Sequence, residues 1–205
     1  MSEVPDGVQM PVFERRPPRP SATLMITRDG DEGVEVLLGK RSDSMPSFPG
    51  YWAFPGGGVS RIDKEASESL GISIQHCAIM REVVEELGLA PQNGQLIAVE
   101  PDFREMVAED KANWFPLALD GDIPSDTTGM RVISMRTTPP FGPMRFENTF
   151  LHIHSNDHDD FSLIGQTEFI AANVAKVHSF VRFPLQRPTV TLLPLQMRCV
   201  RHLTQ

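Results

Sequence analysis

Arg81-Glu82-Val83-Val84-Glu85-Glu86-Leu87-Gly88-Leu89 is the most informative stretch of this 205-residue sequence. At about 100° per residue, a helix through this stretch would separate the apolar side chains from the three glutamates. The apolar side holds Met80, Val83, Val84 and Leu87, and the acidic side holds Glu82, Glu85 and Glu86. Gly88 is a natural stop, because glycine adopts the left-handed conformation that often ends helices. The pattern predicts a helix over residues 74–87.

The three glutamates are spaced three and four positions apart, where side chains on a helix are neighbours and like charges repel. A helix that served stability alone would interleave lysines, and Arg81 offsets only part of the repulsion. A divalent cation such as Mg²⁺ or Mn²⁺ would remove the conflict, because hard cations bind carboxylate oxygens together with substrate phosphates. The alternative is a solvated acidic face of a surface helix.

Three glycines, Gly56, Gly57 and Gly58, end a loop-like stretch over residues 42–58. Without a Cβ, the backbone there can approach a ligand or metal closely, and a glycine carbonyl can serve as a metal ligand. The alternative is a plain hairpin turn. Together with the acidic helix, the glycines favour a metal site.

These residues together resemble the Nudix box, G-x5-E-x7-R-E-U-x-E-E-x-G-U, in which U is aliphatic. The second half matches without exception from Arg81 to Leu89, and Phe54-Pro55-Gly56-Gly57 resembles the family's lead-in. The first half departs from the motif, because its acidic position falls on Asp63 and about ten residues are inserted within 64–80. The resemblance implies an α/β fold, a Nudix-type α/β/α sandwich with a mixed central sheet.

The resemblance also implies a pyrophosphohydrolase, in which water attacks a phosphorus of a nucleoside-diphosphate-linked substrate with Mg²⁺ or Mn²⁺ as cofactor. The implied catalytic residues are Glu82, Arg81 and Glu85, and the implied metal ligands are Glu82, Glu85, Glu86 and the Gly57 carbonyl. Glu82 would be a further ligand or the base that acts on water, and Arg81 would hold the glutamates by ion pairing. Asp63 and Glu147 would assist.

Some Nudix branches that act on coenzyme A derivatives are similar to this chain in their lead-in, in having an aspartate at the first acidic position and in an enlarged box. Residues 37–42 and 139–147 also look like those branches. The first expected substrate is coenzyme A or acyl-CoA. ADP-ribose, NADH and damaged nucleotides stay open, as does a non-catalytic Nudix-fold binding or regulatory module. Lys40, Arg41 and Arg145 are candidate phosphate contacts, with an ordinary surface cation as the alternative for each.

The formal net charge of −8 argues against binding to a nucleic-acid polymer, which requires a basic face. The expected partner is a small nucleotide-type substrate, and the resemblance allows a homodimer. No apolar run approaches the ~20 residues that cross a bilayer, and no secretory signal is recognised, so we expect a cytoplasmic protein that does not enter a membrane. Cys77 and Cys199 do not suggest a disulfide framework.

The rest of the chain predicts an extended, proline- and arginine-rich arm over residues 1–20 and a single Nudix hydrolase domain over 21–205. Strands are expected at 21–27 and 34–38, which would form a hairpin, and at 95–99, 131–136, 146–154 and 163–170. Helices are expected in part of 102–119, at 171–179 and at 189–203. Residues 60–73 are mixed and polar, and no element is predicted for them.

His152 and His154 would share one face of their strand and, with the acidic residues 157–160, look like a metal cluster. The acidic stretch is, however, typical of a solvated turn, and that interpretation is preferred.

Overall fold

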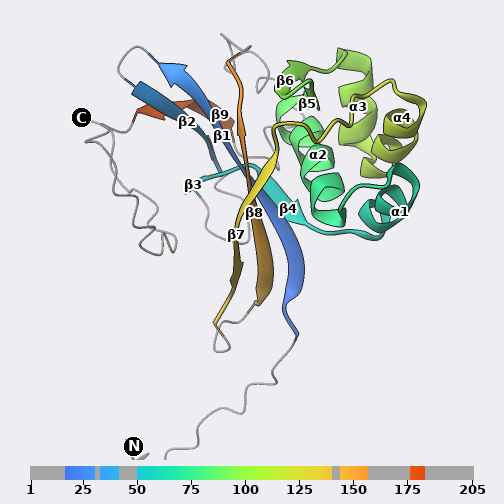
Figure 1. Cartoon of the computed structure of the whole chain (residues 1–205), viewed down its shortest axis with the longest axis horizontal. Helices are drawn as coiled ribbons and strands as arrows, with labels where there is room; N and C mark the ends of the chain where they lie inside the picture. Colours follow the sequence, from blue (N-terminus) through green and yellow to red (C-terminus); the bar gives the residue numbers. More distant parts are fainter. Residues whose placement is uncertain (1–16, 31–32, 42–49, 140–143, 157–175, 183–205) are drawn as a thin grey trace, which may run out of the picture.

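A long hairpin begins the part of the chain that the computed structural model describes, which comprises residues 17–30, 33–41, 50–139, 144–156 and 176–182 (Figure 1). Strand β1 (Arg19–Gly30) pairs antiparallel with β2 (Gly33–Lys40), and Thr27 lies opposite Val36. The predicted hairpin is confirmed, although β1 takes in the last two residues of the predicted arm. Residues 1–16 of that arm lie outside the described residues.

The central sheet is mixed, as predicted. β8 (Phe146–His154) runs parallel to β1, and β7 (Arg131–Thr137) runs antiparallel to β8 at the edge of the sheet. The path of neighbouring strands is β3-β2-β1-β8-β7, with β4 paired to β1 and β9 paired to β2. Two strands are short, β3 (Trp52–Ala53) and β4 (Gly56–Gly58), and β9 spans Lys176–Arg182. The expected strands at 131–136 and 146–154 are therefore confirmed.

The described helices gather on one face of this sheet, together with a small separate hairpin (Figure 1). They are α1 (Arg61–Leu70), α2 (Ile74–Leu87), α3 (Pro101–Glu109), a 3₁₀ turn η1 (Lys111–Asn113) and α4 (Trp114–Asp120). The hairpin consists of β5 (Leu89–Gln92) and β6 (Gln95–Ala98). No helix in the described ranges is long and apolar enough to cross a membrane.

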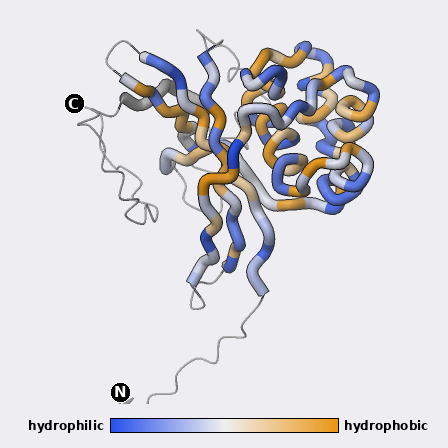
Figure 2. Tube along the Cα trace, viewed as in Figure 1, coloured by the Kyte–Doolittle hydropathy of each residue, from blue (hydrophilic) through white to orange (hydrophobic). Residues whose placement is uncertain are grey.

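Helix α2 occupies the predicted residues and ends at Gly88, whose φ of 66° is left-handed. Its apolar side, including Ile79, Val83 and Val84, is fully buried in a core shared with β1 residues such as Leu24. Figure 2 shows apolar and polar segments following one another along these helices. The periodicity of the sequence therefore located the helix that carries the glutamates and the face that it buries.

Three segments differ from the expectation. Residues 61–70 form α1, for which no element was predicted, and Gly56–Gly58 form a strand instead of a loop. The predicted helix at 171–179 is wrong over residues 176–179, which belong to β9 and extend the sheet beside β2. Residues 176–182 include two valines and a phenylalanine, residue types that favour strands, and β2 supplies backbone partners. The expected elements at 163–170 and 189–203 lie outside the described residues.

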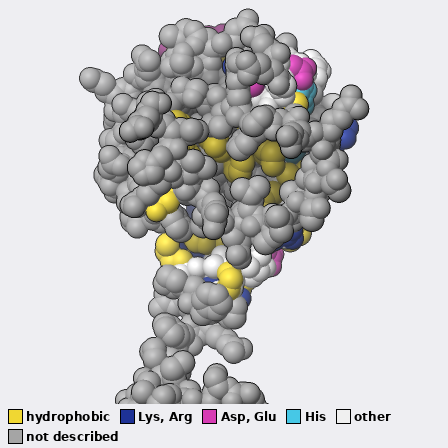
Figure 3. All heavy atoms as spheres, turned by 90° about the vertical axis from the view of Figure 1, so that its left-hand side faces the viewer, with side chains coloured by type: hydrophobic (Ala, Val, Ile, Leu, Met, Phe, Trp, Pro, Cys, Tyr) yellow, Lys and Arg dark blue, Asp and Glu magenta, His cyan; other side chains and the backbone are white. Residues whose placement is uncertain are grey.

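Figure 3 shows the face of the sheet that is turned away from the helices. Hydrophobic side chains of described residues are visible on part of that face. The described part of the chain thus confirms an α/β fold with a mixed sheet and one helical layer.

Helix α1 offers a test of why residues 61–70 are helical. Ser60 and Asp63 form a reciprocal capping box, in which Ser60 accepts from the Asp63 backbone and Asp63 accepts from the Ser60 backbone. We predict that Ser60→Ala lowers the free energy of unfolding by about 1 kcal/mol, measured by urea denaturation. The matched control Ser69→Ala removes an exposed hydroxyl from the same helix and should change stability little. Equal losses in both variants would contradict the capping role.

Candidate active site

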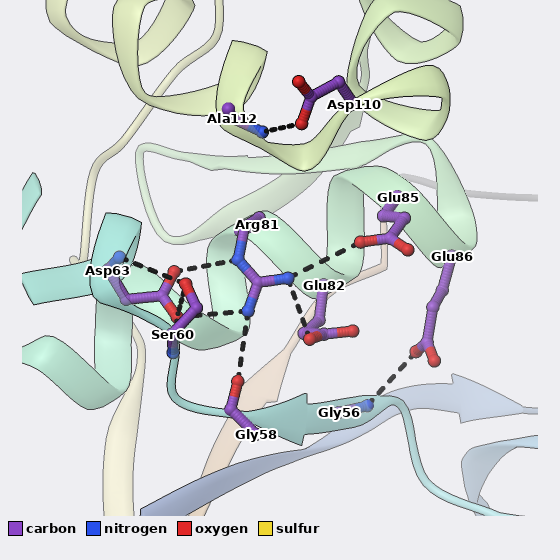
Figure 4. Close-up of polar contacts among 10 residues, drawn as sticks. All are labelled: Gly56, Gly58, Ser60, Asp63, Arg81, Glu82, Glu85, Glu86, Asp110 and Ala112. Atoms are coloured by element: carbon purple, nitrogen blue, oxygen red, sulfur yellow. Dashed lines mark hydrogen bonds and ion pairs between the residues drawn. The ribbon is translucent and has the colours of Figure 1, made fainter.

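A single buried guanidinium, that of Arg81, joins the helices to the glycine strand β4 (Figure 4). Its Nε and Nη2 donate to the two carboxylate oxygens of Asp63 on α1, at 2.8 and 3.1 Å. Nη2 also donates to the Gly58 carbonyl at 3.2 Å. Nη1 donates to Glu82 at 2.8 Å and to Glu85 at 3.5 Å. Arg81 therefore contacts two of the three clustered glutamates as well as α1 and β4.

Asp63 is fully buried, and both of its oxygens are engaged within α1 and α2. Besides the two bonds from Arg81, Oδ2 accepts from the Ser60 backbone at 2.6 Å and from the Ser60 hydroxyl at 2.9 Å. Burial by itself would lower the pKa of Arg81, but the hydrogen bond to Asp63 and the charges of Glu82 and Asp63 outweigh it and hold that pKa above its ordinary value. In this structure the two carboxylate oxygens of Asp63 bind Arg81 and Ser60, and neither is directed to the glutamates of α2.

The glycine strand lies directly against the glutamates. The Gly56 backbone N–H donates to Glu86 at 3.1 Å. A Cβ added to Gly57 would overlap the carboxylate of Glu82, so only glycine fits there without moving that carboxylate. The structure thus brings together the acidic helix face and the glycine stretch that the sequence analysis paired.

Negative charge is concentrated beyond what the nearby cations neutralise. Burial, then the charge of Glu82, raises the pKa of Glu85. The same two causes raise the pKa of Glu86 well above its ordinary value, against a lowering contribution from the Gly56 N–H and Arg41. Carboxylates with raised pKa values, close to one another and to exposed backbone, are typical of functional sites.

The donor set fits a hard divalent cation in charge and in atom type, because it consists of carboxylate oxygens whose repulsion a cation would relieve. The three glutamates are, however, turned to different partners. Glu82 and Glu85 face Arg81, whereas Glu86 faces Gly56. Among the described residues, no three carboxylate, imidazole or thiol side chains already converge as a metal-binding group. Metal binding would therefore require these side chains to rotate.

The other predicted site residues lie around this cluster or away from it. Arg41 is close enough to Glu86 to lower its pKa, whereas the Lys40 side chain lies outside what the structure describes. Arg145 and the exposed Glu147 lie at the start of β8, and β1 separates that strand from β4.

His152 and His154 do share one strand face, as predicted, and both contact the Thr27 hydroxyl, at 2.8 and 3.0 Å. They do not belong to a described group of metal ligands, and residues 157–160 lie outside the described part of the chain.

Two cations near the glutamates were missed by the sequence analysis. Arg104 on α3 donates to the backbone carbonyl of Glu86 at 3.3 Å, and Lys111 on η1 lowers the pKa of Glu85 through its charge. Neither belongs to a motif, and only the packing of α3 against α2 brings them to the site. No local signal in the sequence could have found them.

Comparison with known families agrees with this geometry. The family model described as the NUDIX domain matches residues 17–130, more than half of the chain. The chain belongs to the Nudix family. The matched range contains β1, β4, α1 and α2, and with them every residue of the Arg81 network. Nudix membership supports assignment as a pyrophosphohydrolase.

A solved structure of a Nudix hydrolase shows the same fold. A NUDIX hydrolase from Alicyclobacillus acidocaldarius is 22% identical, with a TM-score of 0.61 over 80% of this chain and 75% of that chain. A MutT/nudix family protein from Enterococcus faecalis is 16% identical, with a TM-score of 0.40 over 73% of this chain and 43% of the other. The NUDIX domain of Shewanella oneidensis NrtR, complexed with ADP ribose, is 12% identical, with a TM-score of 0.41 over 70% and 64%. No curated protein matches.

The Arg81–Asp63 pair is expected to stabilise the fold, because replacing Asp63 leaves the buried Arg81 charge with only the more exposed Glu82 and Glu85 as charged partners. We predict that Asp63→Asn costs about 3–5 kcal/mol in the free energy of unfolding, measured by urea denaturation. Glu65→Gln is the matched control, since Glu65 lies on the same helix but its ion pair with Arg61 is exposed. A loss in Asp63→Asn no larger than in the control would show that the buried pair is dispensable.

The glutamate cluster should destabilise the metal-free protein at neutral pH. Because the pKa of Glu86 is higher in the folded state than in the unfolded chain, folding is favoured by its protonation, and that contribution is lost as pH rises above about 4.5 through the folded pKa. We predict that Glu86→Gln unfolds at a higher temperature than wild type at pH 8 without metal, and that the difference shrinks toward pH 4.5. Calorimetry across this range measures it. A variant less stable than wild type at pH 8 would contradict the charge conflict.

Proposed function

We propose that this protein hydrolyses a pyrophosphate bond in a nucleoside-diphosphate-linked substrate with the help of bound Mg²⁺ or Mn²⁺. The observation that carries the proposal is the arrangement of Glu82, Glu85 and Glu86 on one face of α2 beside the glycine strand. Nudix hydrolases generally use divalent metal ions, and the carboxylates here carry the negative charge that such ions offset. The proposal therefore rests on the negative charge of these three glutamates and on their carboxylate oxygens, which are the ligands that Mg²⁺ and Mn²⁺ prefer.

In this proposal Glu85 and Glu86 are the main metal ligands, with Glu82 and the Gly57 carbonyl beside them. When bound, the metal acidifies water and neutralises charge that builds on the phosphoryl oxygens. Glu82 serves either as a further ligand or as the base that accepts a proton from water. Its carboxylate occupies the place that a side chain at residue 57 would need, so glycine there lets Glu82 lie directly against the strand whose carbonyl is the proposed ligand.

Arg81 positions the glutamates and does not contact the substrate in this proposal. Its guanidinium is buried and already bonded to Asp63, Glu82, Glu85 and the Gly58 carbonyl. Such a planar donor fixes the direction of each carboxylate that it contacts. When Glu82 and Glu85 turn to a metal, Asp63 and Gly58 O still hold Arg81 in place.

Coenzyme A or an acyl-CoA is the first substrate that we propose, because the lead-in, Asp63 and the enlarged box resemble the branches that act on these compounds. ADP-ribose is a second candidate, since the related NrtR domain was crystallised with it. Arg41 is the best-placed of the predicted phosphate contacts, because its charge reaches Glu86. A homodimer in the cytoplasm stays a prediction.

A non-catalytic Nudix-fold binding module is the second candidate function. The observation in its favour is that each glutamate already has a hydrogen-bond partner within the protein and that no described group converges on a metal position. Such a module would bind a nucleotide without turning it over.

The two candidates are separated by incubation with Mg²⁺ or Mn²⁺ and a panel of coenzyme A, acyl-CoA, ADP-ribose, NADH and dinucleotides, with products resolved by chromatography. We predict turnover of at least one substrate and a loss of about a hundredfold or more in Glu86→Gln, equivalent to about 2.7 kcal/mol of transition-state stabilisation. The control Glu68→Gln, on the exposed face of α1, should keep wild-type turnover. Folded protein that binds a nucleotide but hydrolyses none would favour the binding module, and full activity in Glu86→Gln would contradict the metal-ligand role.

A further inference from the structure

The 3₁₀ turn η1 is held rigidly between α3 and α4, beside the acidic end of α2. Arg104, one to two turns earlier on α3, is anchored to the Glu86 carbonyl at 3.3 Å. Within the turn, Asp110 Oδ1 accepts from the Ala112 backbone at 2.9 Å, and the Asn113 side chain donates to the Met106 carbonyl at 2.8 Å. The buried Trp114 fixes the residue that follows the turn. Backbone placement of this turn is therefore set by packing on both sides.

Figure 4 draws Asp110 and Ala112 above Arg81 and Glu85, on the opposite side of the glutamates from the glycine strand. Lys111 stands between these two residues in the chain, and its charge acts on Glu85. It is exposed, and the ion pairs recorded among the described residues do not include it. The charge of Lys111 thus acts on these carboxylates, although its ammonium forms no ion pair with Glu82, Glu85 or Glu86.

We propose that Lys111 is a substrate-binding residue, whose ammonium contacts a phosphate oxygen of the diphosphate that lies over Glu82, Glu85 and Glu86. The inference rests on the proposed function, which it extends by adding a contact from the segment between β6 and β7. An ammonium on a flexible stem suits this task, because it carries three donors and can follow a phosphate as the glutamates turn to metal. Arg41 lies near Glu86, so Lys111 near Glu85 would give the diphosphate a second cationic contact from a different element.

The test compares Lys111→Met with Lys64→Met, which removes the same charge from an exposed position on α1. We expect Lys111→Met to raise KM for the best substrate of the panel about tenfold with little change in kcat, as expected for the loss of one charged hydrogen bond. The Kd for magnesium pyrophosphate, measured by calorimetry, should rise by a similar factor. Lys111→Arg should restore most of both values, and melting temperatures should match wild type.

The outcomes separate the two proposals. Wild-type turnover together with equal KM and Kd in Lys111→Met and Lys64→Met would overturn the role of Lys111 and leave the hydrolase in place. A rise in KM that Lys111→Arg does not reverse, with a lowered melting temperature, would show a structural role and overturn it as well. Wild-type protein that neither hydrolyses the panel nor binds magnesium pyrophosphate would contradict both proposals.

Discussion

The buried guanidinium of Arg81 is the constraint on which the rest of the site depends. A cation with 2% of its side chain exposed requires a charged partner, because leaving water costs several kilocalories per mole unless hydrogen bonds replace it. Asp63 supplies that partner from α1, in a bidentate geometry that fixes the plane of the guanidinium. Once the plane is fixed, the remaining donors reach Glu82, Glu85 and the Gly58 carbonyl. One ion pair therefore couples the fold of two helices to the direction of two carboxylates.

The site also shows how stability and function oppose one another. Glu85 and Glu86 carry raised pKa values because each is partly withdrawn from water beside other carboxylates. A protein selected for stability alone would replace one of them with a neutral or cationic residue. Retaining all three on one face is physically reasonable only where a ligand of opposite charge offsets the repulsion. The cost of the acidic face in the metal-free protein is thus an argument for its use.

Much of this arrangement was predictable because it is local. The 3.6-residue periodicity located α2, Gly88 marked its end, and period-two alternation located β8. Helix α1 was missed, although Ser60 and Asp63 form a capping box, because its polar sequence gave no clear apolar stripe and Asp63 was interpreted as the altered acidic position of a motif with an assisting role. Residues 176–179 of β9 were predicted as helix because the identity of this strand depends on pairing with β2, which lies far away in the sequence. Asp63 illustrates the same limit, since its partner is 18 residues away.

The charges around the site depend in the same way on contacts between segments that are far apart in the sequence, and Lys111 is the example. The chain has a formal net charge of −8, so a polyanionic substrate meets an unfavourable overall field, and its binding must rely on cations placed within a few ångströms of the reacting group. Which cations lie within a few ångströms of the reacting group depends on how the helices pack, and the amino-acid composition does not reveal it. Here α3 packs against α2, Arg104 is bonded to the Glu86 carbonyl, and the following turn carries a lysine whose charge lowers the pKa of Glu85. An acidic protein can thus provide a cationic approach to an acidic site, provided that the cations come from an element whose position is fixed independently of the substrate.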